Sequence, residues 1–346
     1  MEPSKARVYE IDNLKAVLIF LVVLGHLCEK MNFNGSYFLY LIIYSFHMPA
    51  FSFLSGYCGR VHTGGEILRK YVYPYAVFQT LYIIFSNKVL HHAMEFRYTI
   101  PYWILWYLMA LIVWNIVLVF LPDNTWKRAV TLIAAIFLAL MAGYDKTVSY
   151  YLSLSRILVY FPFFLMGYYV KSARLHVFRS QICRPMERKI QNMVRIVSGI
   201  LAVIAVLELH IWSDVIKRSW LYNSYSYSAK DYSIIIRSSL GLVAIIFIIF
   251  LCAFIPGRRI PGITYLGQNT MTVFLLHGFI VKYLNYKKIL QKANFPQDAL
   301  PIQSIVMIFI LTVLILVVCS IKPVKKLLSP LFQWPILGHR NRATVS

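Results

Sequence analysis

The sequence predicts an all-α integral membrane protein, a bundle of about ten transmembrane helices with both termini cytoplasmic. The chain has 346 residues, of which 59% are hydrophobic and 14% are charged, whereas a soluble domain carries about 25% charged residues. The apolar residues fall into long blocks, which is typical of membrane-spanning helices. No loop is long enough for a soluble domain, so we expect residues 1–346 to form a single membrane-embedded domain.

Ten apolar segments are candidate spans. Their expected limits are 14–31, 37–57, 71–91, 102–121, 129–143, 152–170, 194–210, 233–255, 263–284 and 302–321. The segment at 129–143 is short for a hydrocarbon core about 30 Å thick, so we expect it to be less tilted or capped by interfacial groups. An internal repeat is not evident, which weakens the interpretation of the chain as an inverted-repeat transporter.

The formal net charge is +22, and the cations lie in the short segments between the spans. One set of loops, which includes both termini, holds more Lys and Arg than the other, mainly because of the loop at 171–195. The positive-inside rule makes this set cytoplasmic, and attraction to anionic membrane lipids accounts for the charge without nucleic acid. The five cysteines form no C-x-x-C pair, so we expect neither a disulfide framework nor a metal site.

Two ionisable residues share one face of the first span. Lys15 and His26 are eleven positions apart, which is about 20° past three full helical turns and a rise of about 16 Å. A cation at one membrane surface therefore lies in line with an imidazole near the bilayer centre. Ionisable groups at that depth are costly and indicate a functional site. Histidine is the usual general base near neutral pH, and Glu29, one turn on, is placed to orient it or balance its charge.

Further candidates have structural alternatives. In the second span, His47 is expected near mid-depth, and Ser55-Gly56 allows close approach of a ligand or of another helix. Arg156, near the outer end of the sixth span, is a candidate for binding an acidic or hydroxyl-rich molecule, or it extends to the lipid headgroups. Trp106 and Tyr107 either stack on a sugar or belong to the aromatic belt of the membrane interface.

These residues belong to an ordered series of motifs. The series consists of Lys15 and His26; the run from Phe46 to Tyr57; Arg69-Lys70 before Tyr73-Pro74-Tyr75; Trp106-Tyr107-Leu108; Ser153, Arg156, Phe161-Pro162-Phe163-Phe164 and Gly167-Tyr168; and Gly267, Asn269, Thr270 and His277. In this order, over residues 10–320, the chain resembles the membrane acyltransferase-3 family, especially its branch similar to fucose 4-O-acetylases.

The resemblance implies transfer of an acyl group from cytoplasmic acyl-CoA, most often acetyl-CoA, to a hydroxyl of a sugar or cell-surface glycan precursor. The acyl-CoA is a donor substrate, and no permanently bound cofactor is expected. The expected catalytic residues are His26 and Glu29. The expected donor-binding residues are Lys15, Ser55, Gly56, Arg60, Arg69 and Lys70, and the expected acceptor-binding residues are His47, Trp106, Tyr107, Arg156, Asn269 and His277.

The sequence departs from the family pattern at two positions. Lys15 stands where many members have arginine, which removes a bidentate contact to phosphate, and Glu66 stands three residues before Arg69 where many have another arginine. Several alternatives stay open: a transporter or flippase for a polar solute, a sensor or assembly partner, a non-sugar acceptor, a succinyl donor and an acyl-histidine intermediate. We expect a multi-pass protein of a cell membrane, the cytoplasmic membrane in a bacterium, and the sequence leaves its oligomeric state open.

Overall fold

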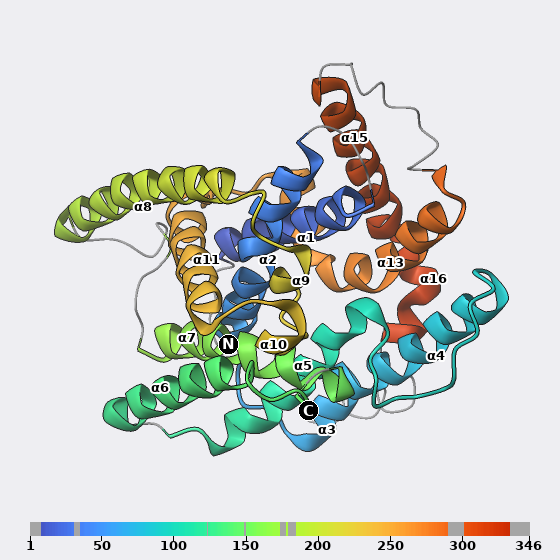
Figure 1. The fold of residues 1–346 in the computed structure, drawn as a ribbon, viewed down its shortest axis with the longest axis horizontal. Helices are drawn as coiled ribbons and strands as arrows, with labels where there is room; N and C mark the ends of the chain where they lie inside the picture. The colour runs from blue at the N-terminus through green and yellow to red at the C-terminus, as the bar shows by residue number, and fades with distance from the viewer. Residues whose placement is uncertain are drawn as a thin grey trace, which may run out of the picture.

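The structure is a computed structural model that describes residues 8–30, 35–122, 124–148, 150–173, 178, 185–289 and 301–332, and every regular element in these ranges is helical (Figure 1). The all-helical prediction is therefore confirmed for the described chain. The longer helices are α1 (Tyr9–Cys28), α2 (Ser36–Cys58), α4 (Tyr73–Lys88), α5 (Trp106–Val117), α6 (Thr125–Met141), α7 (Leu154–Ser172), α8 (Pro185–Ile211), α11 (Ile234–Phe254), α13 (Thr270–Tyr286) and α15 (Pro301–Ser320). The shorter ones are α3 (Gly64–Ile67), η1 (Leu68–Val72), η2 (Trp103–Leu105), η3 (Leu118–Phe120), η4 (Tyr151–Ser153), α9 (Arg218–Leu221), α10 (Tyr227–Lys230), α12 (Pro261–Gln268) and α16 (Lys322–Phe332).

Seven helical segments in the described chain are long and apolar enough to cross a membrane, rather than the ten predicted. The other three predicted spans contain α4, α6 and α13, which have 16, 17 and 17 residues and are just shorter than those seven. The helices are those of a multi-pass membrane protein. Residues 31, 174–177 and 179–184, which belong to the predicted first span and to the loop at 171–195, lie outside the described residues.

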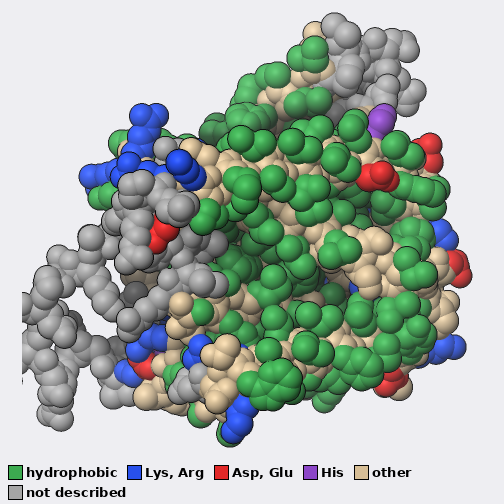
Figure 2. Space-filling view, turned by 90° about the vertical axis from the view of Figure 1, so that its left-hand side faces the viewer, with side chains coloured by type: hydrophobic (Ala, Val, Ile, Leu, Met, Phe, Trp, Pro, Cys, Tyr) green, Lys and Arg blue, Asp and Glu red, His purple; other side chains and the backbone are tan. Residues whose placement is uncertain are grey.

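The helices differ in how much of their surface other helices cover. In α1 and α2, 67% of the most apolar window is buried, whereas in α8 and α11 only 22% is. One face of the molecule is covered largely by hydrophobic side chains, with Lys and Arg mostly at its margins (Figure 2). A water-soluble monomer rarely exposes so large an apolar surface, so α8 and α11 face lipid while α1 and α2 form the centre.

Helices α2 and α7 touch through their backbones at two glycines. A Cβ atom on Gly56 would lie 1.9 Å from the carbonyl oxygen of Phe164, and one on Gly167 would lie 1.9 Å from that of Phe53. Small residues at such positions allow membrane helices to approach closely. This contact fixes the end of α2 that carries Ser55.

The predicted span at 263–284 is wrong as a single helix, because it breaks at Asn269 between α12 and α13. The break follows from packing against α1. Asn13 donates from Nδ2 to the carbonyl oxygen of Pro256 at 2.8 Å and accepts from Thr264 Oγ1 at 2.8 Å. A Cβ on Gly267 would lie 1.8 Å from the carbonyl oxygen of Asp12. The short α12 therefore packs on the start of α1, and α13 begins after Asn269 as a separate helix.

Candidate active site

A cavity of about 560 Å³ lies among α1, α2, α5, α7 and the junction of α12 with α13. Lys15 and His26 both line it, as their spacing on one helix face predicts. The α1 lining continues to Glu29, about 21 Å along the helix from Lys15. The cavity therefore follows most of the length of the first helix.

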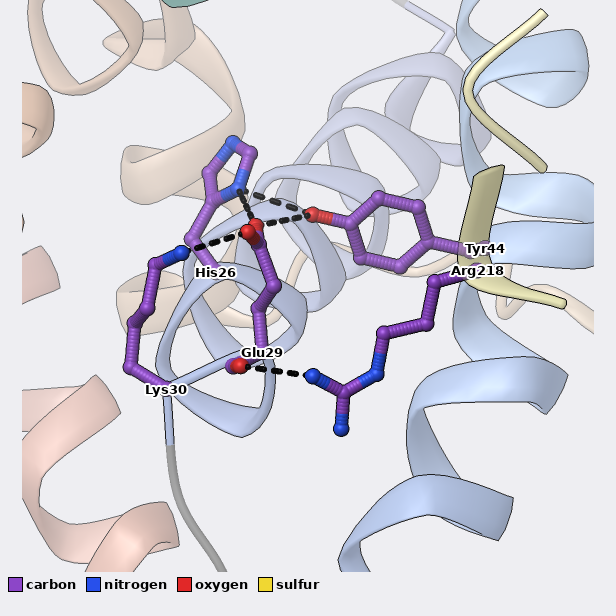
Figure 3. Close-up of polar contacts among 5 residues, drawn as sticks. All are labelled: His26, Glu29, Lys30, Tyr44 and Arg218. Carbon is purple, nitrogen blue, oxygen red and sulfur yellow. Dashed lines mark hydrogen bonds and ion pairs between the residues drawn. The ribbon is translucent and has the colours of Figure 1, made fainter. Parts of the chain in front are cut away.

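The imidazole of His26 is held through one of its nitrogens. Its Nδ1 lies 2.9 Å from the hydroxyl of Tyr44 and 4.0 Å from Oε2 of Glu29, and the Tyr44 hydroxyl donates to the same Oε2 at 3.4 Å (Figure 3). Nδ1–H therefore donates to the Tyr44 oxygen in the neutral ring. The other nitrogen, Nε2, points away from Tyr44 and Glu29 (Figure 3). In this tautomer Nε2 is a proton acceptor.

Glu29 is ionised and held by cations at the end of α1. Lys30 Nζ donates to its Oε1 at 2.7 Å, and Arg218 donates to its main-chain oxygen at 3.2 Å. Burial opposes ionisation, but the interactions with His26 and Lys30 outweigh burial and lower the pKa of Glu29 to about 2. A carboxylate in this position favours the Nδ1–H tautomer of His26, as the buried aspartate of a catalytic triad does.

Two rings limit the movement of His26. The Trp103 ring centroid lies 4.5 Å from that of His26, and the nearly parallel ring of His277 lies at 5.7 Å. His277 is fully buried and uses Nδ1 on the carbonyl oxygen of Val273 at 2.9 Å. Its Nε2 has no hydrogen-bond partner among the described residues. Trp103 has a φ of 36°, a strained value for a bulky residue that often marks functional sites.

Arg156 reaches the cavity from the first turn of α7. Its Nε donates to the carbonyl oxygen of Tyr222 at 3.0 Å, and its guanidinium lies 5.2 Å from the ring centre of Trp106 and 5.6 Å from that of Tyr150. The turn before α7 has left-handed φ values of 51° and 54° at its last two residues, Leu152 and Ser153. The backbone is therefore strained directly before α7, the helix that carries Arg156.

A second cavity of about 600 Å³ adjoins the first and is rich in cations. Both are lined by His62, Lys70, Tyr71, Gln268 and Met271. The second is also lined by Arg60, Arg69, Asn269 and Lys325, among other residues. Lys325, from α16, donates to Oδ1 of Asn269 at 2.7 Å.

Glu66 organises this basic end. Its carboxylate accepts from the main chain of Thr63 at 3.0 Å and from Arg60 at 2.6 Å, and these bonds lower the pKa of Glu66 to about 2. The Thr63 hydroxyl accepts from the Glu66 main chain, which completes a capping box for α3. Glu66 therefore holds Arg60 in the lining of the second cavity, while Arg69 donates to the carbonyl oxygen of Gly65 at 3.1 Å.

A family model described as an acyltransferase domain, that of the acyltransferase-3 family, matches residues 8–322. The chain belongs to the acyltransferase-3 family. A comparison with curated proteins gave no match, and neither did one with solved structures. The chain is thus a membrane acyltransferase with a cavity that contains a histidine of its first helix.

Most of the sequence-predicted site residues of this acyltransferase gather in the two cavities. The first is lined by Lys15, His26, Glu29, His47, Ser55, Lys70, Trp106, Tyr107 and Arg156, and the second by Arg60, Arg69, Lys70 and Asn269. His277 lies behind His26, and Gly56 lies in the α2–α7 contact. Their catalytic and binding roles stay predictions.

Sequence reasoning missed several residues of the acyltransferase cavity. Tyr44 contacts His26, Lys282 lies 4.4 Å from the ring centre of Trp103, and Lys325 joins the basic end. Lys282 carried a usable signal, since it lies five residues after His277 in an apolar segment, and intramembrane charges indicate function. Tyr44 and Lys325 carried no such signal. Tyr44 is an ordinary aromatic residue of a span, and Lys325 is a basic residue beyond the last span.

Proposed function

We propose that this acyltransferase moves an acetyl or other short acyl group from cytoplasmic acyl-CoA to a hydroxyl of a sugar or cell-surface glycan precursor, with His26 as the general base. One observation carries the proposal. His26 lies in the cavity with Nδ1 held by Tyr44 and with Nε2 turned away from that contact. The likeness to fucose 4-O-acetylases favours a sugar acceptor.

The reaction is a direct transfer. The acceptor hydroxyl gives its proton to Nε2 of His26 as its oxygen attacks the thioester carbonyl. The carbon–sulfur bond then breaks, an oxygen ester forms, and the CoA thiolate takes the proton from His26. General base catalysis of this kind contributes about 10²–10⁴-fold, and ionised Glu29 stabilises the imidazolium that forms.

The basic end is suited to the phosphates of the donor. Lys15 and Lys70 line the first cavity, and Lys70 also borders the second, where Arg60 and Lys325 lie. The N-terminus of α13 opens onto both cavities through Met271, and helix N-termini favour anions. From there, the pantetheine arm follows α1 toward His26, about 16 Å away from Lys15.

The membrane arrangement that fits this proposal has ten spans and cytoplasmic termini. Helices α4, α6 and α13 are about 24–26 Å long, which crosses most of a hydrocarbon core about 30 Å thick. Lys15 then faces the cytoplasm, where acyl-CoA is available, and the acceptor approaches from the Glu29 end.

Mass spectrometry of surface glycans tests the overall function. Cells that produce the wild-type protein are compared with cells that produce His26→Gln, and with cells that produce His92→Gln as a control in an exposed loop. The expected result is an acetyl or succinyl increment on the glycans in the wild-type and His92→Gln cells that is absent with His26→Gln. Solute flux in vesicles without CoA release would favour a transporter instead.

Maleimide labelling of Cys58 tests donor binding. Cys58 is exposed and lines the cavity near Lys70, whereas the other free cysteines of the described chain, Cys28, Cys252 and Cys319, are buried. In a Cys183→Ser background, maleimide labelling therefore reports Cys58, with Cys58→Ser as the blank. We expect CoA to slow the labelling and Lys15→Ala to raise the CoA concentration required. Labelling that millimolar CoA leaves unchanged would count against the donor site.

A further inference from the structure

The cavity carries more positive than negative charge at the end near Glu29. Lys30, Arg156 and Lys282 line it there, and Glu29 is the one carboxylate among its described lining residues. That carboxylate already pairs with Lys30 at 2.7 Å. Arg156 and Lys282 therefore face the cavity without a carboxylate partner in the described chain.

The fork of Arg156 is available to a ligand. Its Nε is used by the carbonyl oxygen of Tyr222, and its remaining N–H groups make no hydrogen bond to the described residues. The rings of Trp106 and Tyr150 hold the guanidinium in place. A guanidinium offers parallel N–H donors that match a carboxylate or a phosphate.

Lys282 lies closer to the reacting histidine. Its Nζ is 4.4 Å from the ring centre of Trp103, and that ring is 4.5 Å from the ring of His26. Lys282 and His26 therefore contact the same tryptophan ring, which lines the cavity between them. Trp103 and Trp106 line the same cavity, so aromatic faces and positive charge are available together.

We propose that the acceptor is an anionic sugar, whose carboxylate or phosphate binds Lys282 or Arg156 while a hydroxyl of the sugar faces His26. The inference rests on the proposed function and narrows its acceptor class. In a partly buried cavity, charge attraction is stronger than in water, and a neutral sugar leaves both cations unpaired next to it. The bound anion replaces the water that these cations lose when the cavity fills.

Three probes that differ only at C6 of one ring test this inference. They are methyl glucoside, which is neutral, methyl glucuronide, which has a carboxylate, and methyl glucoside 6-phosphate. Binding to the purified full-length protein is measured by titration calorimetry. We expect at least one anionic probe to bind about tenfold or more tightly than methyl glucoside. The stronger of the two anions tells which of the two groups the site prefers.

Variants assign the preference to the two cations. At least one of Arg156→Gln and Lys282→Gln is expected to weaken the anionic probe about tenfold more than it weakens methyl glucoside, and that variant identifies the cation that binds the anion. Lys217→Gln is the matched control, because Lys217 is exposed and pairs with Asp231 at 3.2 Å outside the cavity. Lys282→Gln keeps the test valid if Arg156→Gln loses the anchor to Tyr222 and fails to fold.

Equal binding of the three probes, or a preference for the anionic probe that is undiminished in both Lys282→Gln and Arg156→Gln, overturns the inference. The Cys58 labelling assay separates this failure from that of the proposed function. If CoA protects Cys58 but the sugars bind equally, only the anionic acceptor is wrong. If CoA gives no protection, the proposed donor site is wrong, whatever preference the sugar probes show.

Discussion

At His26, the contact made by one ring nitrogen decides what the other can do. Tyr44 stands between Nδ1 and the carboxylate of Glu29, at 2.9 Å from the first and 3.4 Å from the second. The hydroxyl accepts from the ring and donates to the carboxylate. This contact orients the ring, and we expect Glu29 and Tyr44 to act as positioning residues for His26.

Glu29→Gln tests that positioning role. The amide keeps the size of the side chain but loses the charge that favours Nδ1–H and stabilises the imidazolium. We expect kcat to fall roughly 10²-fold or more, with KM for acyl-CoA and for the acceptor within about twofold of wild type. Steady-state kinetics separate the two parameters. A rise in both KM values at constant kcat would assign Glu29 to packing instead.

The low pKa of Glu29 also predicts how stability depends on pH. Its pKa is lowered from 4.5 to about 2 in the folded protein, so the unfolded state binds the proton more readily. The stabilisation is fully present above about pH 4.5 and is lost as the pH falls through about 2. Wild type should exceed Glu29→Gln in Tm at pH 7, and the gap should shrink by pH 3. A constant gap over that range would contradict the prediction.

At the scale of elements, the contact between α2 and α7 holds the cavity wall. Gly56→Ala places a methyl group where the carbonyl oxygen of Phe164 lies, so the two helices must separate. Overpacking of this kind costs about 1–3 kcal/mol or more. We expect a lower Tm and a weaker effect of CoA on Cys58 labelling.

Gly241→Ala in α11 is the control for that change, because a Cβ there meets no atom within 4 Å. Alanine is favoured over glycine in a helix by up to about 1 kcal/mol, so Tm should stay the same or rise. Equal effects of the two substitutions would show that the close approach does not limit the packing of α2 on α7.

The helices also show which features of the fold can be predicted from the sequence. Hydropathy located a helix in each of the ten predicted segments, because long apolar runs are a strong and local signal. It missed the break at Asn269, which depends on Gly267 packing against the backbone of α1, a contact with residues far away in the chain. The spacing of Lys15 and His26 was likewise local, whereas the contact of Tyr44 with His26 required the packing of α2 on α1.

At the scale of the molecule, the two ends of the cavity system differ in chemistry. Lys15, Lys70 and Lys325 gather at one end, whereas the other end combines the carboxylate of Glu29 and the ring of Trp103 with Lys30, Arg156 and Lys282. The proposed transfer, with the donor and the acceptor on opposite sides of the membrane, requires two ends that differ in this way.

Reconstituted vesicles test this division. For molecules whose α1 N-terminus faces outward, acyl-CoA added outside should support transfer to an acceptor trapped inside. Molecules of the opposite orientation, selected by blocking outward-facing Cys58 with an impermeant maleimide, should be inactive with external acyl-CoA. Transfer that is equal in both orientations would show that donor and acceptor enter by the same end.

The most direct test of the role of His26 is a comparison of acyl transfer by wild type and His26→Ala at matched donor occupancy. Donor occupancy is matched by the degree of CoA protection of Cys58, which lies about four turns of α2 away from Tyr44, the residue that contacts His26. We predict that His26→Ala binds CoA like the wild type and transfers the acyl group about 10²–10⁴-fold more slowly. Transfer at close to the wild-type rate with the donor bound would show that His26 is not the base.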